Sequence, residues 1–430
     1  MKTNSLPSRV GTLIPGRVGV AGLAIALATL AGCHDDNNPN LPPIIPTPNS
    51  VVVADVNGDG ALDLLVATTA DEGYAQNPGY ADVILNTPGS LGTFHPGVHY
   101  STTGTNPSSI AVADLTGTGF FDLVIANFGT GSVSVFIHGA TLGTFDSAVD
   151  VPTGGQPNQV VISDLKGDGK RDLVLADMSS SGNVIVLMAD PANPGKFLAP
   201  MNLPTGLTTP SVAVGDLNGD GAPDIVAATF DSSGNNGSVK VFYQNPKQRG
   251  TFSAPVTFPA GAQPQSVKIA SLSGNGPPDI IVANFGPGSD GKGMAGVSVV
   301  MHDPSNLGSF LAPVTYTTPG SSIDVAVGTC PGPACSDLNG DGIPDLVVVN
   351  LAPANTGSVS VLLQDSAHPG TFLLPATNYP ALGQPLSVTI ADLNGDGLRD
   401  IVIADGPSAG VLSQNAGSPG TFGAATRVGF

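Results

Sequence analysis

The nine-residue segment DVNGDGALD (55–63) decides the fold, because it recurs along the chain in one register. The further copies are DLTGTGFFD (114–122), DLKGDGKRD (164–172), DLNGDGAPD (216–224), SLSGNGPPD (271–279), DLNGDGIPD (337–345) and DLNGDGLRD (392–400). Successive copies begin 50 to 66 residues apart. A recurrent segment at this period is typical of a chain built from repeated supersecondary units.

The sequence around each copy predicts four short strands. An alternating stretch such as SVAVGDL (211–217) precedes the segment, an apolar run such as DLVVVN (345–350) follows it, and a third stretch such as GSVSVFI (131–137) comes next. Each repeat then carries a phenylalanine that opens a fourth strand, at Phe94, Phe145, Phe197, Phe252, Phe310, Phe372 and Phe422. Strands that are apolar on both faces are covered on both sides. We therefore predict an all-β fold, a seven-bladed β-propeller of four-stranded antiparallel blades over residues 50–430, with the phenylalanines as a packing layer.

The repeat resembles the FG-GAP or VCBS repeat of bacterial surface proteins and of the integrin α-subunit head. The resemblance covers residues 50–430 and implies a seven-bladed propeller with calcium in the loops between the first two strands of some blades. No additional strand is evident before Ser50 to complete a blade from the other terminus. We expect the ring to close by packing of the first blade against the seventh.

The pattern D-x-N-G-D-G-x-x-D supplies the hard oxygen ligands that Ca²⁺ prefers, with a glycine for the turn. Four copies are complete, which predicts about four calcium sites. Their ligands are Asp55, Asn57, Asp59, Ala61 and Asp63; Asp216, Asn218, Asp220, Ala222 and Asp224; Asp337, Asn339, Asp341, Ile343 and Asp345; and Asp392, Asn394, Asp396, Leu398 and Asp400. The seventh-position residue of each set contributes its backbone carbonyl. An EF-hand is rejected because its twelfth position needs a bidentate glutamate and that position is Val66 in the first copy.

Three copies are degenerate. The second has threonine at positions three and five, and the fifth keeps only Asp279, so we expect little or no calcium there. The third retains Asp164, Asp168 and Asp172 as a weaker ligand set, because Lys166 takes the place of the amide.

The acidity of the chain follows from these segments. The net charge is −19, and 18 of the 33 acidic residues lie in the seven copies. An acidic docking face is therefore not needed to explain the charge. Nucleic acid is an unsuitable partner, because phosphate binding needs clustered Lys and Arg and the chain has 14, which look scattered in the sequence.

The N-terminus predicts export. Basic residues precede an apolar stretch (18–30), and LAGC (30–33) resembles the bacterial lipobox. We interpret 1–32 as a lipoprotein signal peptide, Cys33 as the lipidated residue and 33–49 as a Pro-rich tether to the cell envelope, with the outer membrane favoured. Export also favours a disulfide between Cys330 and Cys335, with two free thiols as the alternative.

No recognised catalytic motif occurs, so we predict a protein that is not an enzyme and has no catalytic residues. The expected function is a calcium-binding, lipid-anchored binding, adhesion or scaffold module with a protein or glycan ligand. Two alternatives stay open. One is a carbohydrate-binding lectin and the other is a calcium-dependent polysaccharide lyase, both of which include proteins that resemble this repeat.

Overall fold

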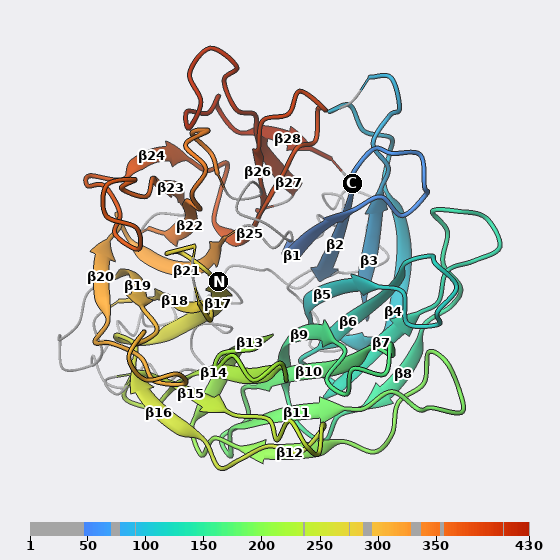
Figure 1. The fold of residues 1–430 in the computed structure, drawn as a ribbon. Coiled ribbons are helices and arrows are strands. Elements are labelled where there is room, and N and C mark those ends of the chain that lie inside the picture. The colour runs from blue at the N-terminus through green and yellow to red at the C-terminus, as the bar shows by residue number, and fades with distance from the viewer. Residues whose placement is uncertain are drawn as a thin grey trace, which may run out of the picture.

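The computed structural model describes residues 47–69, 78–90, 92–234, 237–274, 276–286, 295–327, 337–352, 357–406 and 408–429. The predicted lipid attachment at Cys33, the signal peptide and the Cys330–Cys335 pair lie outside these ranges. The described residues form strands and no helix, so no helix among them is long and apolar enough to cross a membrane. Seven four-stranded antiparallel sheets are arranged as blades around one axis (Figure 1).

The four strands of a blade follow each other in sequence from the axis outward. The first strands are β1 (Thr47–Ala54), β5 (Pro107–Ala113), β9 (Pro157–Ser163), β13 (Thr208–Gly215), β17 (Pro264–Ala270), β21 (Ser321–Ala326) and β25 (Pro385–Ala391). The second strands are β2 (Asp63–Thr69), β6 (Asp122–Asn127), β10 (Asp172–Asp177), β14 (Asp224–Phe230), β18 (Asp279–Asn284), β22 (Leu346–Leu351) and β26 (Asp400–Asp405).

The third and fourth strands form the outer half of each blade. The third strands are β3 (Pro78–Ile84), β7 (Ser132–Phe136), β11 (Asn183–Leu187), β15 (Ser238–Phe242), β19 (Gly296–Val300), β23 (Ser358–Leu362) and β27 (Ser408–Leu412). The fourth strands are β4 (Val98–Thr105), β8 (Val149–Pro152), β12 (Met201–Pro204), β16 (Val256–Pro259), β20 (Val314–Thr317), β24 (Thr377–Pro380) and β28 (Thr426–Val428).

The core lies between the blades. Each of seven apolar clusters joins residues of two neighbouring blades, which explains why the second strands are buried along nearly their whole length. A single sheet cannot bury both of its faces alone, so each blade depends on its neighbours. The predicted seven-bladed fold is confirmed.

The ring closes without a strand exchanged between the termini. β1 packs against β25 and β26, and one apolar cluster contains both Val51 of blade 1 and Val402 of blade 7. Figure 1 shows the C-terminal blade next to the N-terminal one. Closure by packing of blade 1 against blade 7 is therefore confirmed. β1 begins at Thr47, so the first blade includes three residues that the sequence analysis assigned to the tether.

The repeated phenylalanines pack between blades as predicted, although they do not begin the fourth strands. Each forms an isolated bridge to the residue just beyond the third strand, for example Phe145 to His138. The fourth strand starts several residues later, because a short turn and often a proline follow the phenylalanine. Tyr100 of blade 1 meets Phe145 of blade 2 edge to face, with ring centroids 5.6 Å apart. Such pairs tie the outer rims of neighbouring blades together.

Candidate metal loops

The seven Asp-rich segments connect the first and second strands of their blades. We number each loop by its blade, so that loop 1 is 55–63 and loop 7 is 392–400. Gly58 and Gly60 of loop 1 have φ values of 74° and 89°, and the other loops repeat such pairs. Left-handed backbone at two alternate positions turns the chain tightly enough to bring the polar side chains of one loop together.

The first aspartate organises the turn. Asp55 Oδ1 accepts hydrogen bonds from the N–H groups of Gly58 (2.7 Å) and Asp59 (3.1 Å), and Oδ2 accepts one from Gly60 (2.8 Å). The first aspartates of loops 4, 6 and 7 make the corresponding bonds to both glycines. Each carboxylate oxygen has two lone pairs, so these bonds leave capacity to bind a cation.

The amide and the middle aspartate lie next to each other. Asn57 Nδ2 donates to Asp59 Oδ2 at 2.7 Å, and Asp59 Oδ1 accepts the N–H of Ala61 at 2.8 Å. Loops 4 and 6 repeat both contacts. The side chains predicted as ligands at positions three and five therefore come together in these loops.

The ninth aspartate has a second role that sequence reasoning missed. Asp63 is fully buried, and its Oδ2 accepts the N–H of Val56 (3.0 Å) while Oδ1 accepts the N–H of Asn86 beyond the third strand (2.9 Å). All seven blades make both bonds. The sequence did contain a sign of this second role, because loop 5 has lost every other aspartate and still keeps Asp279 at the ninth position.

Burial makes the ninth carboxylate difficult to ionise in the complete loops. Desolvation raises the pKa of Asp63 and of Asp224 to about 6, and that of Asp345 to about 7, although two backbone N–H groups act in the opposite direction. The two other aspartates of each loop raise these pKa values further by charge repulsion. A divalent cation would relieve this repulsion.

The chemical types of the ligand atoms in the complete loops suit calcium. Each complete loop offers carboxylate, amide and carbonyl oxygens and no nitrogen or sulfur donor, as a hard cation requires. Among the described residues, no group of three or more His, Cys, Asp or Glu side chains is already gathered in a metal-binding arrangement. The first and ninth aspartates accept backbone N–H groups, and the remaining lone pairs of their oxygens are the ones available to an ion.

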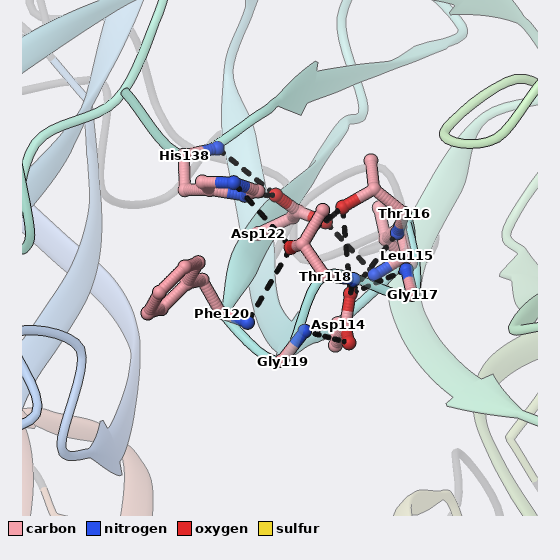
Figure 2. Close-up of polar contacts among 9 residues, drawn as sticks. All are labelled: Asp114, Leu115, Thr116, Gly117, Thr118, Gly119, Phe120, Asp122 and His138. Atoms are coloured by element: carbon pink, nitrogen blue, oxygen red, sulfur yellow. Dashed lines mark hydrogen bonds and ion pairs between the residues drawn. The ribbon is translucent and has the colours of Figure 1, made fainter. Parts of the chain in front are cut away.

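Loop 2 replaces the charged middle positions with hydroxyls and a histidine (Figure 2). Thr116 Oγ1 lies 3.1 Å from Thr118 Oγ1 and 3.4 Å from Asp122 Oδ2. His138 Nδ1 lies 2.8 Å from Asp122 Oδ1, and His138 Nε2 lies 3.4 Å from Thr118 Oγ1. The loop is thus linked internally by side chains that carry their own hydrogen-bond donors.

Loop 5 has the same histidine in the same place. His302 Nδ1 lies 2.8 Å from Asp279 Oδ1, and the ring is nearly buried. The hydroxyl, imidazole and carboxylate of loop 2 could suggest a catalytic triad. However, the pair recurs in loop 5, where Asn275 stands at the position of Thr118, and this recurrence favours a structural role for the histidine.

The residue just beyond the third strand therefore differs with the type of loop. Where the loop is complete it is an amide, and where the loop has lost its middle aspartate it is a histidine. The amides are Asn86, Gln244, Gln364 and Gln414, and the histidines are His138 and His302. In blade 3 the residue is Ala189. The register of this residue was visible in the sequence, but its contact with the ninth aspartate was not.

Basic residues that look scattered in the sequence lie on the face of blades 3 and 4 that carries the Asp-rich loops, where the turn with Arg249 packs against loop 3 and the turn with Lys196 packs against loop 2. Arg249 Nη2 donates to the carbonyl of Gly221 in loop 4 at 2.7 Å, and its Nη1 lies against Gly167 of loop 3. Six of the ten described Lys and Arg residues belong to loop 3 or to the turns before β12 and β16 on the same face, namely Lys166, Lys170, Arg171, Lys196, Lys247 and Arg249. None of the six forms an ion pair with a carboxylate within the part of the chain that the structure describes.

Comparison with known proteins agrees with this architecture. The family profile of FG-GAP-like repeats matches residues 164–227 and 337–403, which contain loops 3, 4, 6 and 7. A search of curated proteins found no match.

Three similar solved structures share the fold at low sequence identity. A putative 6-phosphogluconolactonase from Bacteroides uniformis is 14% identical, with a TM-score of 0.53 over 82% of this chain and 92% of that one. A second, from Bacteroides fragilis, is 13% identical, with a TM-score of 0.52 over 90% and 96%. BBS1N, solved in complex with ARL6DN, is 13% identical, with a TM-score of 0.51 over 85% and 91%. The chain is thus a seven-bladed β-propeller that carries FG-GAP-like repeats.

Proposed function

We propose that this protein is a non-catalytic, calcium-stabilised propeller that is lipid-anchored at the bacterial cell envelope and serves as a binding or scaffold module. The observation that carries the calcium proposal is the chemistry of loops 1, 4, 6 and 7. Each holds three aspartates and an amide within nine residues, and its ninth carboxylate is buried near two like charges. Oxygen-only ligands favour Ca²⁺ over ions that need nitrogen, sulfur or strict octahedral geometry.

The proposal assigns about four ions rather than seven. In loops 2 and 5, threonine or serine stands where the complete loops have charged or amide ligands, and a histidine contacts the ninth aspartate. In loop 3 the ammonium of Lys166 competes with a cation, and the guanidinium of Arg249 lies beside it. Native mass spectrometry and calorimetry on the exported chain should count four calcium ions. No uptake at millimolar calcium would refute the calcium proposal.

The exposed basic residues on the face of blades 3 and 4 that carries the Asp-rich loops support a docking position for an anionic partner. The group defined by Lys196, Lys247 and Arg249 is exposed, and the complete loops on the same face are acidic. Charge complementarity of this kind steers a partner toward one part of a surface. We expect an acidic glycan or an acidic protein segment from the envelope, and no nucleic acid, because the described basic residues are few.

A binding screen tests the module function. A glycan array in calcium, combined with a pull-down from envelope extract, separates a lectin from a protein scaffold, while depolymerisation of an acidic polysaccharide would indicate a lyase. Alanine substitution of Lys196, Lys247 and Arg249 together should abolish capture. The matched control replaces Lys240 and Arg427, which lie on β15 and β28 outside this group. Equal capture by both variants would exclude the docking position.

The lipid anchor has its own test. Metabolic labelling with a fatty acid should modify the wild-type chain, and Cys33→Ser should prevent the labelling. Labelling of the variant to the same extent would exclude Cys33 as the attachment point.

A further inference from the structure

The boundary between blade 7 and blade 1, which we call the seam, joins the two ends of the described chain. β1 packs against β25 and β26, yet no strand is shared across the seam, because every blade consists of four consecutive strands. At the other six boundaries the chain itself runs from one blade to the next, but β28 and β1 are the last and first strands of the described chain and no chain segment joins them. The seam depends on side-chain packing and on hydrogen bonds between side chains and backbone.

The first strands of the other six boundaries are linked by hydrogen bonds near the axis. The links are Ile110 N–H to Ser50 Oγ, Val160 N–H to Ser109 Oγ, Val212 N–H to Gln159 Oε1, Val267 N–H to Ser211 Oγ, Ser266 Oγ to Asp324 Oδ1, and Val388 N–H to Asp324 Oδ2. At the seam, Ser387 occupies the register of Ser50 and Ser211. Within the described ranges, Ser387 makes no side-chain hydrogen bond to β1.

The seam is instead linked on the face of the ring that carries the Asp-rich loops. Asn86 of blade 1 donates from Nδ2 to the carbonyl of Leu393 in loop 7 at 2.9 Å. The backbone N–H of the same Asn86 donates to Asp63 of loop 1, and the N–H of Leu393 donates to Asp400 of loop 7 at 3.2 Å. Two peptide groups and one amide side chain thus connect the ninth aspartates of two complete loops across the seam.

The next boundary has the same arrangement. Gln414 of blade 7 donates from Nε2 to the carbonyl of Leu338 in loop 6 at 2.6 Å, and its N–H donates to Asp400 at 2.9 Å. Leu338 N–H in turn donates to Asp345 at 2.8 Å. In contrast, the amides of Gln244 and Gln364 donate to Pro223 and Pro344 within their own blades. These side-chain amide links therefore join loops 6, 7 and 1, the three complete loops that are consecutive around the ring. The carbonyl of Val56 in loop 1 also accepts a bond from blade 2, from the backbone N–H of Gly143 at 3.1 Å.

We propose that calcium bound in loops 7 and 1 holds the ring closed at the seam, through the hydrogen-bond chain Asp63–Asn86–Leu393–Asp400. The inference rests on the proposed calcium binding and adds a regulatory consequence to it. The second residue of the loop is the pivot, because its N–H is fixed by the ninth aspartate and its carbonyl accepts the bond from the neighbouring blade. An ion that fixes the ninth aspartate fixes this peptide, and separation of the blades must then disturb the site.

Hydrogen exchange of the exported chain, in calcium and after chelation, tests the proposal. Opening of the seam that releases one ion should be suppressed about hundredfold at a calcium concentration about one hundred times Kd. Exchange at β1, β25 and β26 should therefore become about hundredfold faster in chelator. The internal reference is the boundary between β5 and β9, whose loops are both degenerate, and exchange there should change much less.

Two variants at one register test the link. Asn86→Ala removes the bond to Leu393, together with the bonds of the same side chain to Leu62, Thr87 and Gly92 within blade 1. It keeps the backbone N–H that binds Asp63, so the variant should still bind four calcium ions. Its seam should exchange rapidly even in calcium. Gln244→Ala is the matched control, because the Gln244 amide bonds only within blade 4 in the described structure, and its seam should behave as in the wild type.

The outcomes distinguish this inference from the calcium proposal. If calcium binds and the wild-type seam exchanges at the same rate with and without it, or if protection changes equally at every boundary, the inference is wrong and the calcium proposal stands. If no calcium binds, both are wrong. The wild-type comparison needs no variant, so poor folding of Asn86→Ala would not prevent a decision.

Discussion

Loops 1 and 2 share one backbone and differ in the charge that they enclose. In both, the first aspartate accepts N–H bonds from two glycines and the ninth aspartate accepts two backbone N–H groups. Loop 1 adds Asn57 and Asp59, whereas loop 2 adds two threonines and His138. Loop 2 builds the same turn from two aspartates, two hydroxyls and an imidazole. In loop 1 three carboxylates repel one another, and the proposed ion would relieve this repulsion.

The largest expected effect is the removal of calcium. Each occupied loop should add about 2.7 kcal/mol to the free energy of unfolding when calcium is about a hundredfold above Kd. Chelation should therefore lower the melting temperature markedly. Calorimetry with and without chelator measures this shift, and exchange mapping should assign the loss of protection to blades 1, 4, 6 and 7 rather than to blades 2 and 5. An unchanged melting temperature would contradict the claim that calcium stabilises loops 1, 4, 6 and 7.

The fifth loop position offers a matched pair of single substitutions. Asp59→Ala should remove one of four ions and about 2.7 kcal/mol of calcium-linked stability under the same conditions. Thr118→Ala in loop 2 should leave the ion count unchanged and cost about 1 kcal/mol or less, because it removes only exposed hydrogen bonds. Titration calorimetry and chemical unfolding in calcium and in chelator measure both. A lost ion in Thr118→Ala would show that loop 2 also binds metal.

In loops 2 and 5, which contain the histidines, a substitution should change stability independently of calcium, unlike Asp59→Ala in loop 1. His302→Ala removes the ring partner of the buried Asp279 and should cost about 1–3 kcal/mol. The cost should be equal in calcium and in chelator, because no ion is involved. His368→Ala is the control, since His368 contacts Asp365 at the same 2.8 Å but is largely exposed. Its cost should stay within about 0.5 kcal/mol. Chemical unfolding curves compare the two variants.

The sequence predicted the repeat, the blade and the position of the loops, because all three follow from local residue patterns with a fixed period. It did not predict the bond between Asn86 and Leu393, which are 307 positions apart, because that contact exists only once the ring has closed. The placement of Arg249 against loops 3 and 4 was missed for the same reason. The double role of Asp63 was missed because its second partner, Asn86, lies beyond the third strand and 23 positions along the chain.

The response to pH is the effect that best separates an ion from a proton. The pKa values of Asp63 and Asp224 are raised to about 6, and that of Asp345 to about 7, from a reference of 3.8. Between these limits the folded chain binds more protons than the unfolded chain. In chelator, its stability should therefore be greatest near pH 4 and fall as the pH rises through 6 to 7.

Calcium should reverse this trend, because the ion binds the deprotonated carboxylates and competes with the proton. In calcium, stability should rise with pH over the same range. Unfolding curves from about pH 4 to about pH 8, a range that includes these raised pKa values, measure both slopes. Asp63→Asn should reduce each slope, since the amide cannot titrate, and Asp122→Asn in loop 2 serves as the control for the loss of a buried carboxylate. Parallel slopes with and without calcium would mean that the ninth aspartate contributes to the backbone links and not to the metal site.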